Sequence, residues 1–265
     1  MRRDAEPEYE VYIFRYGTGP SYPLAGMAYR MGDKGEIVKD LTLSYWGIIG
    51  NGKKIIFDTG VLNSELAKDW FGVTDFETPR SMLAKIDLTP EEITDVVISH
   101  IHRDHSGNIR AFPNAKIWIQ REELEFAAGR STKTNLQTAK GIPFDDVLEI
   151  VKLNAAGRVE LIEGDQILFP GVNVYVVPQG HTWASQFMVV NTKTGSIVLA
   201  SDNADLWLNI EKNIPGGIGY SLWAMENGIK RMKSFVKDTK DIIPGHDPKI
   251  FDVYKPIAPG VAKVR

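Results

Sequence analysis

The sequence predicts an α/β fold in which two sheets pack together and helices lie on the outside. Short β-rich runs, separated by Gly, Asp, Asn and Pro, occupy most of the chain. These runs fall into two groups, and helical segments accompany each group. The 265 residues, of which 43% are hydrophobic, suffice for one large α/β domain. Since no segment has the composition of a linker, we expect a single domain over residues 1–265.

The strands are expected where β-branched and aromatic residues cluster between turn residues. In the first group they are Tyr9–Arg15, Leu41–Ile49, Lys54–Phe57, Asp95–Ser99 and Lys116–Gln120. In the second group they are Val159–Ile162, Gln166–Leu168, Val172–Val177, Gln186–Asn191, Ser196–Ala200 and Asp241–Ile243.

Helices are expected where hydrophobic residues recur at helical spacing. The segments are Ser64–Trp70, Pro79–Ala84, Arg121–Ala128 and Leu222–Val236, the last with an apolar stripe interpreted as a core face. Two further segments, Arg130–Gly157 and Asn203–Tyr220, are interpreted as long loops over the surface. Loops of such length inside a domain often serve as lids or binding walls.

Composition excludes several classes of function. The net charge of −3 gives no general attraction to nucleic acid or to anionic membranes. The chain has no cysteine, which excludes disulfides and thiolate metal ligands. No apolar stretch approaches the roughly 18 residues of a membrane span, and no signal peptide is recognised. We therefore expect a cytoplasmic enzyme.

All five histidines lie where one metal site would require them. His100, His102 and His105 are in the segment HIHRDH, whereas His181 and His246 are in PQGHTW and IIPGHDP. Two carboxylates accompany them, Asp104 inside the first segment and Asp202 in ASDNAD. Imidazole and carboxylate together are ligands for Zn²⁺, Fe²⁺, Mn²⁺ or Co²⁺ rather than for Ca²⁺ or Mg²⁺.

The spacing of His100 and His102 indicates a pair of ligands at a strand end. Residues two apart in an extended segment point to the same side. On a helix they would lie about 200° apart and could not chelate together. Asp104 continues this series, and His105 turns inward as the chain bends at residues 106–108. Four ligands in so short a segment suit two adjacent ions that share a bridge.

The remaining candidates also follow predicted strands, where ligand sites of α/β folds gather. Taken alone, His181 and His246 would be read as buried, hydrogen-bonded histidines, and Asp202 as a turn or N-cap residue. The shared context favours ligation. Asp58, in IIFDTG, is expected to orient a ligand through a hydrogen bond or to have a purely structural role. Arg103 should point outward and form a structural salt bridge.

The pattern His100-x-His102-x-Asp104-His105, followed by His181, Asp202 and His246, resembles the metallo-β-lactamase superfamily, as does Asp58-Thr59-Gly60 upstream. The resemblance extends over about residues 9–248. It implies a four-layer αββα sandwich of two mixed sheets with outer helices and with the metals at one edge. It also implies that His100, His102 and His181 hold one ion and that Asp104, His105 and His246 hold another, with Asp202 between them. Two divalent ions are therefore expected, Zn first, with Fe, Mn or Co as alternatives.

Within that superfamily the chain looks most like the N-acyl homoserine lactonases. Its size and the segments SHIHRDHSGN, GHTWASQ and ASD fit that branch, whereas the commonest β-lactamases use a cysteine where Asp202 stands. One position departs from the branch, which typically has a substrate-binding tyrosine three residues after the bridging aspartate. Here Asp205 stands at that position. Either another phenol takes over, from Tyr220, Tyr45 or Tyr22, or the substrate is a different one.

The resulting hypothesis is a quorum-quenching lactonase in which a metal-bridging hydroxide opens a lactone or ester and Asp104 shuttles the proton. The alternatives are hydrolysis of a thioester, β-lactam or phosphodiester, and a non-catalytic metal-binding protein. The expected partner is a small lactone or ester, with no nucleic acid or membrane, and relatives suggest a homodimer. Apolar pocket walls are expected from Trp183, Trp207, Leu208, Ile214, Ile218 and Trp223.

Overall fold

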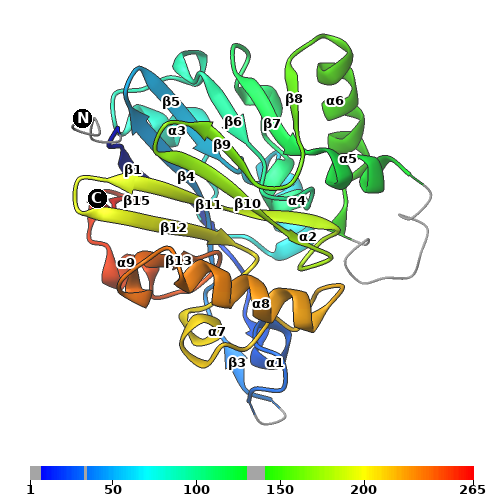
Figure 1. Ribbon diagram of the computed structural model, residues 1–265, viewed down its shortest axis with the longest axis vertical. Helices are drawn as coiled ribbons and strands as arrows, with labels where there is room; N and C mark the ends of the chain where they lie inside the picture. Colours follow the sequence, from blue (N-terminus) through cyan, green and yellow to red (C-terminus); the bar gives the residue numbers. More distant parts are fainter. Residues whose placement is uncertain (1–6, 33–34, 130–140) are drawn as a thin grey trace, which may run out of the picture.

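Two large mixed sheets stack against each other in the computed structural model, which describes residues 7–32, 35–129 and 141–265 (Figure 1). The larger sheet has the order β14 (Pro256–Ala258), β15 (Val261–Lys263), β1 (Glu10–Thr18), β4 (Thr42–Gly50), β5 (Lys53–Phe57), β6 (Asp95–Val97), β7 (Lys116–Gln120) and β8 (Val159–Ile162). The smaller sheet has the order β13 (Ile242–Pro244), β12 (Gly195–Ser201), β11 (Ala184–Thr192), β10 (Val172–Pro178) and β9 (Gln166–Phe169).

Helices cover the outer face of each sheet. Buried residues of α2 (Ser64–Phe71), α3 (Pro79–Ala84), α5 (Arg121–Ala128) and α6 (Phe144–Ala155) pack against the larger sheet. Buried residues of α7 (Trp207–Lys212) and α8 (Leu222–Lys233) pack against the smaller sheet, as Figure 1 also shows. The remaining elements are short: α1 (Leu24–Met27), α4 (Arg103–Ser106), α9 (Ile250–Val253), the pair β2 (Tyr22–Pro23) and β3 (Ile37–Val38), and 3₁₀ turns at Pro90–Glu92, Ile109–Ala111 and Thr239–Asp241.

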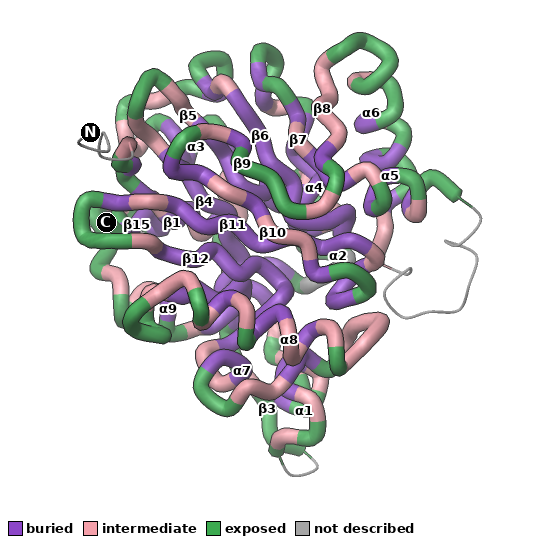
Figure 2. The backbone as a smooth tube through the Cα atoms, viewed as in Figure 1, coloured by how far each residue is buried: buried purple, intermediate pink, exposed green. Residues whose placement is uncertain are grey.

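The alternation of side chains along β1 shows why four layers form. Val11 and Ile13 point between the two sheets and join a cluster that includes Met188 of β11. Phe14 points the other way, into the cluster beneath the helices. Because a strand that is apolar on both faces must be covered on both, the larger sheet requires a sheet on one side and helices on the other. Figure 2 shows this strand layer as the most buried part of the molecule.

The predicted αββα sandwich is therefore confirmed, and each predicted strand overlaps an observed one. Val159–Ile162, placed above in the second group, nevertheless forms β8 of the larger sheet, beside β7. The two predicted surface loops are wrong in part. Residues 144–155 of the first form α6, whereas its residues 130–140 lie outside the described ones, and residues 207–212 of the second form α7. The hydrophobic residues of α6 do not all lie on one buried face, because Val147 and Ile150 are buried whereas Phe144 is 73% exposed. The last predicted helix ends at Lys233, three residues before Val236.

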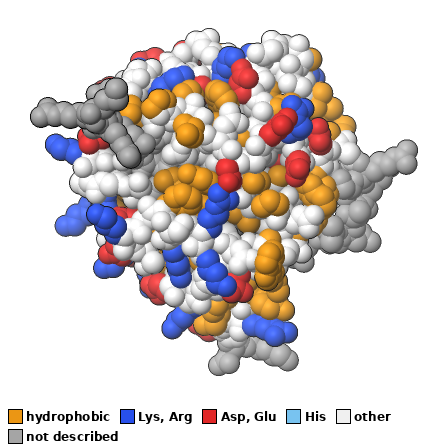
Figure 3. Space-filling model, viewed as in Figure 1, with side chains coloured by type: hydrophobic (Ala, Val, Ile, Leu, Met, Phe, Trp, Pro, Cys, Tyr) orange, Lys and Arg blue, Asp and Glu red, His pale blue; other side chains and the backbone are white. Residues whose placement is uncertain are grey.

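Charges of both signs are interspersed with hydrophobic side chains on the face of the molecule in Figure 3. In the part of the chain that the structure describes, no helix has the length and apolar character needed to cross a membrane.

Candidate metal centre

The predicted ligands converge at one edge of the sandwich, on loops that leave the strands. His100 and His102 follow β6, His181 follows β10, Asp202 follows β12 and His246 follows β13. All of them are buried, as are Asp104 and His105, and none of these residues is more than 7% exposed. The structure thus brings together all seven residues of the predicted site. The extended series does not continue to Asp104, because α4 begins after His102 and carries Asp104 and His105 in its single turn.

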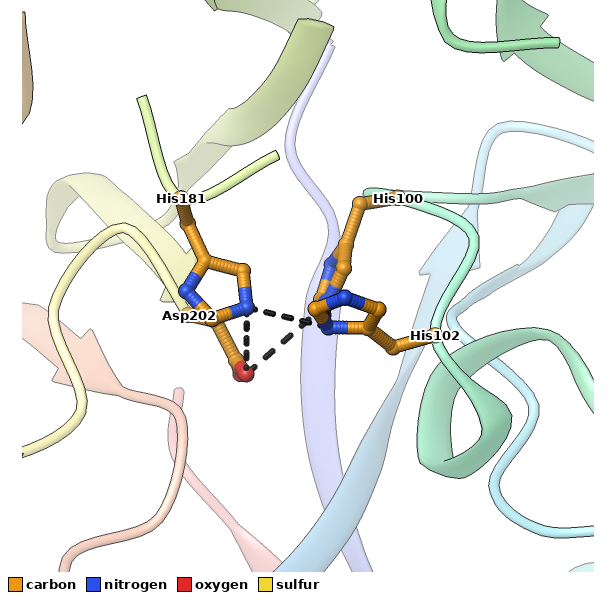
Figure 4. A group of neighbouring side chains, drawn as sticks. All are labelled: His100, His102, His181 and Asp202. Carbon is orange, nitrogen blue, oxygen red and sulfur yellow. Dashed lines mark hydrogen bonds and ion pairs between the residues drawn. The ribbon is translucent and has the colours of Figure 1, made fainter. Parts of the chain in front are cut away.

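One group contains His100, His102, His181 and Asp202, whose donor atoms face one another in Figure 4. His102 Nδ1 lies 3.0 Å from His100 Nε2 and 3.1 Å from His181 Nε2. Asp202 Oδ2 lies 3.3 Å from His181 Nε2 and 3.8 Å from His100 Nε2. Donors at about 2.0–2.1 Å from a tetrahedral Zn²⁺ would be separated by roughly 3.3 Å. The spacing of this group therefore fits a single cation.

A second group contains Asp104, His105 and His246. Asp104 Oδ2 lies 3.5 Å from His105 Nε2 and 3.9 Å from His246 Nε2. The other oxygen of Asp202, Oδ1, lies 3.2 Å from His105 Nε2 and 3.0 Å from His246 Nε2. Asp202 consequently presents one oxygen to each group, which is the arrangement of a bridging carboxylate.

Two metal-donor atoms in this region, His105 Nε2 and Asp202 Oδ1, are buried and lie 3.2 Å apart, yet neither makes a hydrogen bond of normal geometry. Buried polar atoms are rarely left unsatisfied, so their convergence requires an explanation. A cation between them supplies it, since imidazole nitrogen and carboxylate oxygen are its natural donors. The residues present therefore fit a divalent metal site.

Hydrogen bonds on the far side of the rings fix which nitrogen faces the site. His246 Nδ1 donates to the Thr42 carbonyl at 3.0 Å, and His181 Nδ1 donates to the Ile218 carbonyl at 3.2 Å. Because a carbonyl oxygen only accepts, these nitrogens carry the proton and the Nε2 lone pairs point inward.

Asp58 orients His105 in the same way. His105 Nδ1 donates to Asp58 Oδ2 at 2.9 Å, and Ser99 donates to both oxygens of Asp58, with its N–H at 2.7 Å and its hydroxyl at 2.8 Å. Asp58 adopts a left-handed conformation with φ of 64°, which aspartate tolerates better than most residues. Of the two roles expected for Asp58, the structure thus supports the orienting hydrogen bond.

Burial and mutual charge determine the protonation states of the ligand residues in the absence of metal. Burial opposes ionisation of Asp202 and Asp104, yet the charge of His105 holds the pKa of both carboxyls below their usual range. Burial lowers the pKa of His181 to about 4. Burial also tends to lower the pKa of His246, but the negative charge of Asp202 outweighs it and raises the pKa of His246 to about 9. Metal uptake must therefore displace the proton of His246, so affinity for a cation should fall as the pH decreases.

Arg103 is half-buried rather than turned fully outward. Burial raises the pKa of Asp146 to about 6, and the charges of Arg110 and Arg103 oppose that rise. Arg103 is therefore within electrostatic reach of Asp146, while its salt bridge stays a prediction.

A pocket of about 590 Å³ opens above the two groups. His102, Asp104, His181, Asp202 and His246 contribute to its lining, and Asp205 and Gly141 lie among them. A Cβ atom on Gly141 would come within 2.7 Å of the His102 ring, so this glycine lets the chain pass directly over a ligand. The rest of the lining is mostly apolar or aromatic. It consists of Pro20, Tyr22, Gly26, Met27, Leu41, Leu43 and Ile218.

Most of the predicted pocket wall is wrong. Six wall residues were expected from the sequence, and the structure describes all of them. Only Ile218 lines the pocket. Trp207 and Leu208 line a separate hollow, because the predicted loop that carries them forms α7. Trp183 stacks on Phe126 with ring centroids 4.8 Å apart, and Trp223 is 76% exposed.

Ile214 packs with the cluster around Leu24 and Met27 rather than lining the pocket. The real wall comes largely from residues 20–27 and 41–43. Of these residues the sequence singles out only Tyr22, as a candidate phenol, because the others carry no metal-ligand signal.

Of the three candidate phenols, only Tyr22 lines the pocket. Tyr45 is fully buried in the core beneath the helices, and Tyr220 packs edge-on against Trp183. Asp205 is buried beside His246, whose backbone N–H donates to the Asp205 carbonyl at 2.9 Å. A carboxylate oxygen of Asp205 lies within 4.8 Å of the donor atoms of Asp202 and His246.

Comparisons with known proteins agree with this geometry. A family model described as the metallo-beta-lactamase superfamily matches residues 40–203. An N-acyl homoserine lactonase from Bacillus cereus is 30% identical over 207 residues, which cover 73% of this chain and 76% of that protein. The N-acyl homoserine lactonase AiiA from Bacillus thuringiensis subsp. kurstaki is 31% identical over 169 residues, 63% of this chain and 61% of that protein.

Solved structures show the same fold. A quorum-quenching N-acyl homoserine lactone lactonase superposes with a TM-score of 0.75 at 23% identity and covers 96% of this chain and 98% of its own. A dizinc quorum-quenching lactonase with the product N-hexnoyl-L-homoserine superposes with a TM-score of 0.67 at 21% identity, covering 98% of each chain.

Proposed function

The chain belongs to the metallo-beta-lactamase superfamily, in its N-acyl homoserine lactonase branch, and on that premise we propose that it is a metal-dependent lactonase acting on N-acyl homoserine lactones or closely related lactones. The observation that carries the proposal is the position of Asp202, which presents one oxygen to each of two buried ligand groups at the floor of an apolar pocket.

In this proposal the three imidazoles of His100, His102 and His181 would hold one divalent ion. Asp104, His105 and His246 would hold the second, and Asp202 would offer one oxygen to each. Zinc is the expected metal, although the same donors accept Fe, Mn or Co and cellular supply decides among them. When bound, such ions lower the pKa of a water molecule and polarise an ester carbonyl.

Asp104 carries the proton. It lines the pocket, and coordination to the second ion would favour its carboxylate form at neutral pH. Tyr16 donates its hydroxyl to the Asp104 carbonyl at 3.1 Å, which holds this turn in place. The carboxylate accepts the proton of the attacking water and returns it to the alkoxide that leaves when the ring C–O bond breaks.

The apolar wall supports a substrate with an acyl chain. Met27, Leu41 and Leu43 offer hydrocarbon surface beside the ligands, which suits an acyl chain better than a phosphate or a sugar. A volume of about 590 Å³ falls within the range of small-molecule pockets.

A substrate panel tests the proposal. Acyl homoserine lactones of increasing chain length, a simple lactone, a thioester, a β-lactam and a phosphodiester are compared by kcat/KM, each with and without a chelator. We expect the acyl lactones to be turned over fastest and the activity to vanish with chelator. Preferred turnover of the thioester or phosphodiester, or activity that survives complete removal of metal, would contradict the proposal.

Tyr22 is the phenol that we assign to the substrate carbonyl in place of the missing tyrosine. Its ring packs over Gly26, where a Cβ atom would come within 2.4 Å of it, and this contact holds the ring at the pocket. We expect Tyr22→Phe to lower kcat/KM about 10-fold, because one hydrogen bond to the reacting carbonyl is lost, and to leave metal content unchanged. Steady-state kinetics check this.

The competing assignment is Asp205, which occupies the sequence position of that tyrosine. If Tyr22→Phe has the kinetics of the wild type whereas Asp205→Ala does not, the carboxyl and not the phenol serves the substrate.

A further inference from the structure

Glu123 is a buried carboxylate that lies outside both ligand groups. It belongs to α5, which packs on the outer face of the larger sheet, and the residue is 1% exposed. Oε1 accepts a hydrogen bond from the Ile101 N–H at 3.0 Å. Oε2 accepts two, from the Thr182 hydroxyl at 2.9 Å and from the Ala184 N–H at 2.8 Å.

These three donors come from the two loops that supply the imidazoles of the first group. Ile101 lies between His100 and His102, and Thr182 directly follows His181. One carboxylate therefore connects the loop after β6 with the loop between β10 and β11. Across this junction His102 Nδ1 lies 3.1 Å from His181 Nε2, although the two residues are 79 apart in the sequence.

Other bonds also cross the junction, but they lie deeper in the sandwich. The Gln186 N–H donates to the Ser99 carbonyl at 3.0 Å, and the Gln186 side chain donates to the Ile98 carbonyl at 2.8 Å. These bonds hold the strands together before the loops begin. Within the loops themselves, Glu123 accepts hydrogen bonds from residues that are adjacent in sequence to all three histidines.

The chemistry of the junction requires a carboxylate. All three partners are donors, and only an ionised carboxyl offers two oxygens that accept without donating. A glutamine there would retain one accepting oxygen and turn an NH₂ group toward the remaining donors. Burial of a charge is tolerated when hydrogen bonds satisfy it, as these three do.

We propose that Glu123 is a positioning residue, which sets the approach of His181 to His100 and His102 and thereby the affinity of the first ion position. This inference rests on the proposed function, because it takes the group as an ion site. The second group has a support of its own in Asp58, which bonds the His105 ring directly. Loss of Glu123 should therefore weaken one ion position and spare the other.

The test uses a His246→Ala background, in which the second group lacks a ligand and the first position remains. Binding of Co²⁺ and Zn²⁺ to the metal-free proteins is measured by competition with a chelator, and Co²⁺ absorption reports the geometry of the bound ion. We expect Glu123→Gln to lower affinity 10- to 100-fold, the range for residues that orient metal ligands, and to change the Co²⁺ spectrum. Thr182→Val, which removes one donor and disturbs folding less, should lower affinity by a smaller factor.

Asp95→Asn in the same background is the matched control. Asp95 is a buried carboxylate on β6. It accepts hydrogen bonds from Lys53 Nζ and the Trp118 indole, both at 2.9 Å, and both partners lie outside the ligand loops. Its loss should lower the thermal midpoint of the metal-free protein at least as much as Glu123→Gln does, while ion affinity stays within about twofold.

Equal affinity losses in Glu123→Gln and Asp95→Asn, or unchanged affinity and spectrum in both Glu123→Gln and Thr182→Val, would overturn the inference and leave the proposed function intact. Failure of the wild-type chain itself to bind a transition metal would overturn the proposed function and the inference with it.

Discussion

Asp202→Ala abolishes turnover and leaves fewer than two ions per chain. The variant removes Oδ2 from the group of His100, His102 and His181 and Oδ1 from the group of His105 and His246. Loss of a residue that merely orients a ligand costs 10- to 100-fold in activity, so loss of a ligand to both groups should cost at least about 10³-fold in kcat. Steady-state kinetics and metal analysis of the same preparation check this.

Asp165→Ala is the control for that variant. Asp165 is an exposed aspartate that pairs with Arg231 on the surface, so its removal should change kcat less than twofold and leave metal content unaltered. Full turnover by Asp202→Ala would rule out a shared carboxylate at the centre of the site.

Asp104→Asn has the second largest expected effect. Asparagine keeps the shape of the side chain and one oxygen but cannot take up the proton of the attacking water. We expect kcat to fall about 10²- to 10⁴-fold, the range for loss of general acid–base catalysis, with a much smaller change in KM. The pH profiles of kcat and kcat/KM are measured for both proteins.

Excess metal separates the two roles of Asp104. If the residue acted only as a ligand, saturating metal would restore turnover in Asp104→Asn. We expect second-site occupancy to return under these conditions while kcat stays low. Recovery of wild-type kcat would contradict proton transfer by Asp104.

The metal centre could be predicted from the sequence because its residues lie close to strand ends. The buried run Val96–Ile98 indicated a strand, and the two-residue spacing of His100 and His102 then required a common direction. His181 and His246 followed from the same local pattern. The extended alternation does not continue to Asp104, because that residue lies in α4. Asp104 nevertheless lies with the other ligands.

The pocket wall could not be predicted, because it depends on packing between distant segments. Tyr22 and Met27 reach the pocket through close contact between Gly26 and Gly217, whose N–H donates to the Gly26 carbonyl at 3.0 Å. Nothing in either local sequence indicates this contact. Tryptophans on α7 and α8, in contrast, were predicted as wall residues from their type alone and lie elsewhere.

Glu123 was missed for a related reason. In the segment REELEF it resembles the solvated charges beside it, but in the fold it is buried and hydrogen-bonded to the ligand loops. A glutamate three residues into a helix is ordinarily favoured by the helix dipole and exposed to solvent. Its three hydrogen bonds become visible only in three dimensions.

Elemental analysis of the protein, produced and purified without chelators, tests the central claim most directly. With His100, His102, His105, His181 and His246 gathered around Asp202, two divalent transition-metal ions per chain are predicted. Protein that is folded and carries no transition metal, and takes up none when Zn²⁺ or Co²⁺ is supplied, would contradict the account.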